Sequence, residues 1–106
     1  MATSPTQLTL KKLRAEGYQV EVVERWVPGI NIRKDLFGFI DILGVKDGET
    51  IAVQSTSDNG GNVAKRVQKI ADSENVAAVR KANWTLHVHG WKKVKNRWQC
   101  RVVDVS

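Results

Sequence analysis

The chain has one cysteine, Cys100, among its 106 residues. A single thiol can form neither an intramolecular disulfide nor a multi-cysteine zinc site, which excludes the disulfide-stapled secreted domains and the common zinc modules. No apolar run approaches the roughly 20 residues needed to cross a bilayer, so we expect no membrane association. Charged side chains interrupt the first 30 residues and leave no apolar segment typical of a secretory signal. We therefore expect a cytoplasmic protein.

Acidic residues are scarce in the second half of the chain. Residues 1–60 carry seven Lys or Arg and eight Asp or Glu, whereas residues 61–106 carry ten and three, for a net charge of +6 overall. Segregated positive charge favours a polyanionic partner. Nucleic acid is favoured over a membrane surface because no basic amphipathic segment has a broad apolar face. The alternative is a basic surface that only maintains solubility.

The length and the 42% hydrophobic content predict one globular domain over residues 1–106. Periodicity and turn residues predict, in order, a helix over 5–16, strands over 18–26, 36–45 and 51–57, helices over 62–71 and 73–82, and strands over 84–91 and 97–105. The two middle helices can equally be one element. This order, α-β-β-β-α-(α)-β-β, predicts an α+β (α/β) fold with a mixed sheet flanked by helices. Strand 36–45 is apolar on both faces, so we expect it at the centre of the sheet.

Two acidic residues occupy positions where apolar side chains are expected. Asp41 lies within strand 36–45, and Glu24 lies on the inward side of strand 18–26. Burying an unpaired charge is costly, so such groups are usually paired, protonated or bound to a cation. Gln54 and Thr56 share one face of the next strand and offer oxygen ligands. These residues predict a site for Mg²⁺ or Mn²⁺ with Asp41, Glu24 and Gln54 as ligands.

Each of these residues also has a structural alternative. Asp41 can be paired with a basic residue or can cap a loop, and Glu24, near a strand end, can reach solvent. Gln54 and Thr56 can be polar residues of a half-exposed strand. Only their common placement favours a site.

The segment Asp35-Leu36-Phe37-Gly38-Phe39-Ile40-Asp41, followed by Gln54-Ser55-Thr56 and a helix with Lys65, Arg66 and Lys69, resembles the PD-(D/E)XK nuclease superfamily. Within it, the sequence is similar to small phage-type or Holliday junction resolvase-like endonucleases. The resemblance covers about residues 18–91. It implies a restriction-endonuclease-like core and a Mg²⁺-dependent deoxyribonuclease that acts on DNA, including branched or junction DNA. It also implies a homodimer and a bacterial or phage-infected cell.

By this resemblance, Asp41 is the metal-holding aspartate and Glu24 the upstream acidic residue. Gln54 stands at the second acidic position and Thr56 at the lysine position, and both depart from the superfamily pattern. A lysine of helix 62–71, Lys65 or Lys69, is expected to supply the missing cation, with Lys34 as a weaker candidate. The predicted catalytic set is therefore Glu24, Asp41, Gln54, Thr56 and Lys65. The departures leave a second hypothesis, a catalytically inactive nuclease-like module that binds nucleic acid.

Basic side chains predict the phosphate contacts. The predicted nucleic-acid-binding residues are Lys34, Lys65, Arg66, Lys69, Lys92, Lys93, Lys95 and Arg97. The last four form the densest cluster, at the turn between strands 84–91 and 97–105, and a solvated loop is the alternative there.

Three residue types near the C-terminal hairpin have both a functional and a structural interpretation. His87 and His89 alternate on one strand, where a core role is favoured over zinc binding because no Cys or further His accompanies them. Trp91 beside two lysines is a candidate for stacking on a base. Cys100 is expected to be a buried structural thiol.

Overall fold

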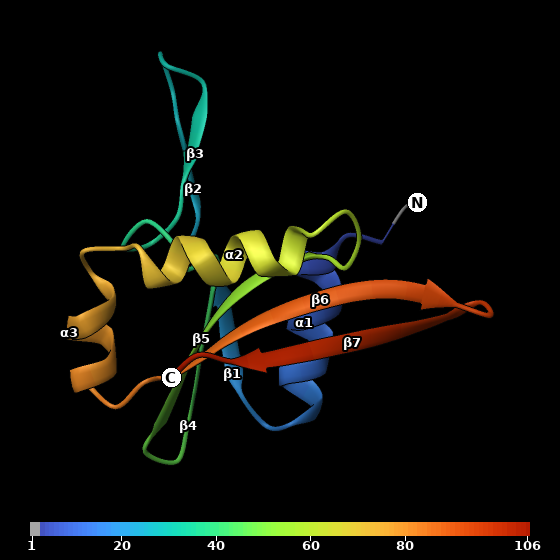
Figure 1. Ribbon diagram of the computed structural model, residues 1–106. Helices are drawn as coiled ribbons and strands as arrows, with labels where there is room; N and C mark the ends of the chain where they lie inside the picture. Colours follow the sequence, from blue (N-terminus) through green and yellow to red (C-terminus); the bar gives the residue numbers. More distant parts are fainter. Residues whose placement is uncertain (1–2) are drawn as a thin grey trace.

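A five-stranded mixed sheet organises the structure, a computed structural model that describes residues 3–106 (Figure 1). The elements are α1 (Pro5–Ala15), β1 (Gln19–Val22), β2 (Arg25–Val27), β3 (Ile32–Lys34), β4 (Ile42–Lys46), β5 (Glu49–Ser57), α2 (Asn62–Ala71), α3 (Val76–Lys81), β6 (Thr85–Val94) and β7 (Arg97–Asp104). The strand order is β1-β4-β5-β6-β7, with β5 and β6 parallel and the other neighbours antiparallel. The predicted α+β class with a mixed sheet flanked by helices is confirmed.

Helices cover both faces of the sheet (Figure 1). On one face, Leu10 and Leu13 of α1 pack against apolar residues of β4 and β5. On the other face, Val63 and Ile70 of α2 and residues of α3 pack against β5 and β6. This arrangement follows from the alternation along β5, which directs Val53 to the first layer and Ala52 to the second.

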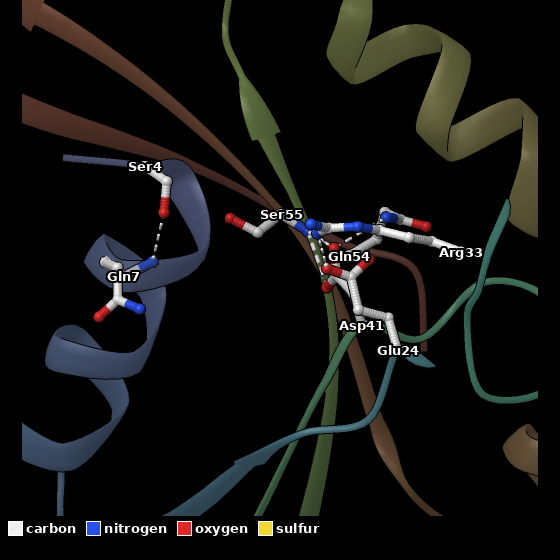
Figure 2. Close-up of polar contacts among 7 residues, drawn as sticks. All are labelled: Ser4, Gln7, Glu24, Arg33, Asp41, Gln54 and Ser55. Atoms are coloured by element: carbon white, nitrogen blue, oxygen red, sulfur yellow. Dashed lines mark hydrogen bonds and ion pairs between the residues drawn. The ribbon is translucent and has the colours of Figure 1, made fainter. Parts of the chain in front are cut away.

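The first helix begins and ends where its sequence predicts. The Ser4 hydroxyl accepts a hydrogen bond of 3.2 Å from the backbone N–H of Gln7, and Pro5 occupies the first turn (Figure 2). Gly17 follows the helix with φ +94°, a left-handed conformation that costs glycine little. Helix 5–16 is thus confirmed to within one residue.

Removing this cap is expected to destabilise the protein. Ser4→Ala leaves the Gln7 N–H without its partner, and we expect the free energy of unfolding to fall by about 1 kcal/mol. Urea unfolding followed by circular dichroism measures the change. Ser4→Asp keeps an oxygen acceptor and should retain wild-type stability, and equal midpoints for Ser4→Ala and Ser4→Asp would contradict the capping role.

The prediction of one strand over 18–26 is wrong. β1 ends at Val22, and the chain then leaves the sheet to form a separate hairpin of β2 and β3 (Figure 1). Trp26 pairs with Arg33 across the turn that contains Pro28 and Gly29. The alternation of apolar and polar residues continues from β1 into β2. A repeat of two residues indicates a strand but does not show which strand it pairs with.

The prediction that a strand begins at residue 36 is also wrong. β4 begins at Ile42, and residues 36–41 form a turn closed by a bridge between Leu36 and Ile40. Phe37 and Gly38 have φ values of 55° and 85°, and this left-handed backbone reverses the chain inside the apolar run. Asp41 therefore lies directly before β4, and the central strand is β5 instead of β4.

The remaining elements agree with the sequence. The two middle helices are separate, the Asp47-Gly48 turn joins β4 to β5, and β6 and β7 form a long hairpin. Within residues 3–106, no helix has the length and apolarity required to cross a membrane.

Candidate metal and nucleic-acid site

Asp41 is fixed where β1, β4 and β5 meet. Its backbone N–H donates to the carbonyl of Val53, and its own carbonyl accepts from the N–H of Val23 at 2.9 Å. The side chain is 4% exposed. Both carboxylate oxygens accept from the Ser55 N–H at 3.2 Å, and Oδ2 also accepts from Gln54 Nε2 at 3.0 Å (Figure 2). The carboxylate is thus held in one orientation by the backbone and side chain of β5.

The surroundings of Asp41 favour its protonated form. Burial raises its pKa from 3.8 to about 7, and the nearby charges of Asp35 and Glu24 act in the same direction. The hydrogen bond from the Ser55 N–H opposes this shift. Within residues 3–106, no Lys, Arg or His side chain forms an ion pair with Asp41. Of the two structural alternatives for Asp41, pairing with a basic residue is therefore excluded within residues 3–106, whereas its side chain does bind a backbone N–H, that of Ser55.

Glu24 lies next to Asp41 but is not on a strand of the sheet. It follows β1 at the base of the β2–β3 hairpin, directly after Val23, whose N–H donates to the Asp41 carbonyl (Figure 2). Its Oε1 accepts from Arg33 Nη1 at 3.0 Å, and the Glu24 side chain is 20% exposed. The structure therefore brings the two predicted acidic residues together, and it adds a guanidinium to one of them.

Gln54 and Thr56 are both buried on β5, as their shared parity predicts. Gln54 donates to Asp41 through its amide nitrogen, while its Oε1 is buried and has no hydrogen-bond partner within residues 3–106. A buried amide oxygen without a partner is unusual and calls for a ligand or a rotated amide. Gln54 is thus in contact with the predicted metal-holding carboxylate and has one coordinating atom to spare.

The predicted lysines of α2 differ in their contacts. Lys69 forms an ion pair of 3.2 Å with Asp35, the same acid whose charge raises the pKa of Asp41. Lys65 lies one turn earlier and is exposed, and it makes no ion pair in the part of the chain that the structure describes. Lys69 is therefore the lysine that approaches the site, and a catalytic role for Lys65 stays a prediction.

Three residues of the site were not predicted from the sequence: Arg33, Asp35 and Ser55. The Pro28-Gly29 turn gave a usable signal for Arg33, because a hairpin around it returns Arg33 toward Glu24. Asp35 comes into place only through the tight turn that follows it. Ser55 contributes a backbone N–H, which no side-chain pattern indicates.

The other predicted basic residues lie on the surface. Lys92, Lys93, Lys95 and Arg97 are exposed at the end of the β6–β7 hairpin, which projects from the body of the protein (Figure 1). Lys93 lies 5.6 Å from the centre of the Trp98 ring. Arg66 on α2 is partly exposed, and Lys34 at the end of β3 is exposed. The arrangement provides separate basic regions at the hairpin tip and beside Asp41.

The interpretation of Trp91 as a base-stacking residue is wrong. Trp91 is buried, and its Nε1 donates to the Thr9 hydroxyl at 2.9 Å. The same hydroxyl contacts His89 Nδ1 at 3.3 Å, and burial lowers the pKa of His89 to about 4. Burial also raises the pKa of Cys100 to about 11, so its thiol is not a nucleophile near neutral pH. Trp91 and His89 thus belong to the packing between α1 and the sheet, whereas Cys100, expected to be buried, is only partly so.

The donor atoms around Asp41 suit a hard divalent cation. Within residues 3–106, no group of three His, Cys, Asp or Glu side chains is placed to hold an ion. Mg²⁺ does not require one, because it is typically bound through one or two carboxylates and keeps several waters. Asp41, Glu24 and the unpartnered Gln54 Oε1 offer oxygen atoms of the type that Mg²⁺ prefers, and a metal site there stays a prediction.

Comparisons with known proteins give no assignment. No family model matches the chain, and no curated protein or solved structure gives a significant match.

Proposed function

We propose that this protein is a metal-dependent endonuclease that hydrolyses DNA phosphodiester bonds, with Asp41 as the principal metal ligand. The observation that carries the proposal is a carboxylate 4% exposed with no cationic side chain paired to it within residues 3–106, beside a second acid and a free amide oxygen. Folding alone does not favour such a group. A site that needs the charge explains its presence, and the resemblance to PD-(D/E)XK nucleases supports the same chemistry.

Each residue then has a definable role. Asp41, Glu24 and Gln54 would hold Mg²⁺ or Mn²⁺, which when bound supplies Lewis-acid stabilisation and an activated water. The Ser55 N–H fixes the orientation of Asp41. Arg33 uses one donor on Glu24 and has others left for a phosphate oxygen, so it can supply the positive charge that Thr56 lacks.

The expected substrate is DNA bound mainly through its backbone. Lys and Arg contacts to phosphate carry no direct sequence information, which favours structure-selective cleavage, including branched or junction DNA. A homodimer suits a substrate with paired strands. Sedimentation of the protein as a monomer, alone and with DNA, would count against junction resolution.

A nucleic-acid-binding module without catalysis is the second candidate. The ion pair between Glu24 and Arg33 and the threonine at position 56 favour it, because they remove a free carboxylate and an amine from the site.

A cleavage assay separates the two candidates. Supercoiled, linear and branched DNA are incubated with Mg²⁺ or Mn²⁺ and, in parallel, with a chelator. We expect metal-dependent cleavage that falls by at least about 100-fold in Asp41→Asn, since even the outer partners of metal ligands contribute 10–100-fold. Asp47→Asn, at an exposed turn, is the matched control. DNA binding without cleavage would favour the module, and failure to bind any nucleic acid would contradict both.

The salt dependence of DNA binding tests the basic hairpin tip. We expect Lys92→Gln, Lys93→Gln and Lys95→Gln combined to reduce the slope of log K against log [salt] by up to about 3, because each phosphate contact with duplex DNA contributes about 0.9. Fluorescence anisotropy over a salt series measures the slope. Lys11→Gln on α1 should leave the slope unchanged, and an unchanged slope in the triple variant would place the DNA elsewhere.

A further inference from the structure

Phe37 is held in an unfavourable backbone conformation with its side chain about half exposed. Its φ is 55°, a left-handed value that is uncommon for a bulky residue, and its side chain is 47% exposed. Asn75 Nδ2 donates to the Phe37 carbonyl at 3.0 Å, and the Leu36–Ile40 bridge closes the turn. About half of the residue stays exposed although the turn places Phe37 in an uncommon backbone conformation, so the exposed part of the ring calls for another explanation.

An apolar pocket opens beside this ring. It has a volume of about 160 Å³ and is lined by Phe37, Trp84, Asn75 and the α3 residues Ala78, Val79 and Ala82. The Phe37 and Trp84 ring centres are 6.3 Å apart and the planes are inclined by 48°. An apolar cavity of about 150 Å³ accepts benzene, so this pocket has room for an aromatic ring. The Asn75 amide adds one polar group to the lining.

A basic pocket shares Phe37 and Asn75 with the apolar pocket. It has a volume of about 420 Å³, and its cationic residues are Arg33, Lys34 and Lys69. Asp35 is its only acidic lining residue within residues 3–106, and it is already paired with Lys69. The excess positive charge suits an anion such as a phosphate.

We propose that the two pockets together bind one unstacked nucleotide of a nucleic-acid strand, with its base against Phe37 and Trp84 and its phosphate among the three cations. The proposal rests on the proposed function and defines its substrate as DNA with unpaired nucleotides. Asp35 connects the basic pocket to the site, because its charge acts on Asp41. A second copy of the chain is disfavoured as the occupant, since the chain carries a net charge of +6.

Two alanines of α3 provide a matched test. Ala78 lines the apolar pocket, whereas Ala77, its exposed neighbour on the same helix, does not. In the presence of a chelator, the affinity of each variant for a short oligo(dT) strand and for a blunt duplex is measured by fluorescence anisotropy. We expect Ala78→Leu and Phe37→Ala to weaken strand binding by about 5- to 150-fold, the loss of one base stack, and duplex binding to change less than about twofold. Ala77→Leu should bind like the wild type.

A spectroscopic arm reports the stacking itself. A strand with one 2-aminopurine should lose fluorescence on binding to the wild type and to Ala77→Leu, but not to Ala78→Leu. Thermal unfolding of each variant verifies that it is folded. Because Ala78 lies on α3 and outside the strained turn at Phe37, Ala78→Leu tests the pocket without altering that turn.

The outcomes separate this inference from the proposed function. Equal strand binding by Ala78→Leu and Ala77→Leu would overturn the pocket assignment even if Asp41-dependent cleavage is observed. Weakened strand binding without any cleavage would support the pocket and contradict the enzyme. If thymidine 5′-monophosphate competes as effectively as the unlabelled strand, the inference is overturned in favour of a free-nucleotide site. If Ala78→Leu sediments differently from the wild type, the inference is overturned in favour of a second copy of the chain.

Discussion

Asp41→Asn is expected to be more stable than the wild type at pH 8, by up to about 4 kcal/mol, although it removes the proposed principal metal ligand. Asparagine has the shape of a protonated aspartate and carries no charge. Its oxygen can accept from the Ser55 N–H, and once the Gln54 side-chain amide rotates to present Oε1 in place of Nε2, the amide of the introduced asparagine can donate to that oxygen. Residues that serve a site are often unfavourable for the fold, and this substitution measures that cost.

The pH dependence follows from the direction of the pKa shift. The pKa of Asp41 is raised from 3.8 to about 7 in the folded protein, so between these values the native state binds the proton more tightly than the unfolded chain does. The stabilising contribution of the protonated group is complete below about pH 4 and is lost as the pH rises through 7. The advantage of Asp41→Asn should therefore be absent near pH 4 and complete at pH 8.

Chemical unfolding of the metal-free protein in chelator, from pH 4 to pH 8, measures this profile. Asp47→Asn, at the exposed turn between β4 and β5, should follow the wild type at every pH. An Asp41→Asn variant that is less stable than the wild type at pH 8 would mean that the hydrogen bonds to the carboxylate outweigh its burial.

Much of the fold could be predicted because its patterns are local. Ser4 and Pro5 begin a helix and Gly17 follows its end, and the Asp47-Gly48 turn defines a hairpin. Periodicity also separates the two faces of β5, so Gln54 and Thr56 were placed together correctly. Each of these features depends on residues within a few positions of one another.

The errors arose where tertiary structure decides between equivalent local patterns. The segment around Trp26 would show the same alternation of side chains as an extension of β1 or as part of a new hairpin. Only the pairing of Trp26 with Arg33 shows that it forms a hairpin. The apolar run before Ile42 has the composition of a strand, yet the left-handed backbone at Phe37 turns it back. Both errors adjoin Asp41, and functional sites are where local patterns and the final structure are expected to disagree.

Gly90→Ala is expected to cause the largest loss of stability among the small substitutions in the sheet. Gly90 lies in β6, paired with Thr56 of β5 and Arg101 of β7, directly beneath α2. A Cβ added there would overlap Val63 Cγ2 and lie 3.1 Å from Asp58 Cβ. Neither α2 nor β6 can move away without disturbing the packing on both sides, and overpacking of this kind costs about 1–3 kcal/mol.

A double-mutant cycle attributes that loss to the overlap. Val63→Ala leaves space and destabilises the protein by itself, but it also removes the methyl group that meets the new Cβ. The combination of Gly90→Ala and Val63→Ala should therefore be more stable than the sum of the two losses predicts, by at least about 1 kcal/mol. Gly44→Ala is the matched control, because its Cβ would be tightly packed without overlap, 3.0 Å from Ile51 Cγ2, 3.2 Å from Val20 Cγ1 and 3.3 Å from Tyr18 Cβ, so we expect a smaller loss. Equal losses for Gly90→Ala and Gly44→Ala in urea unfolding, or additive losses in the cycle, would show that contact between β6 and α2 does not require glycine at position 90.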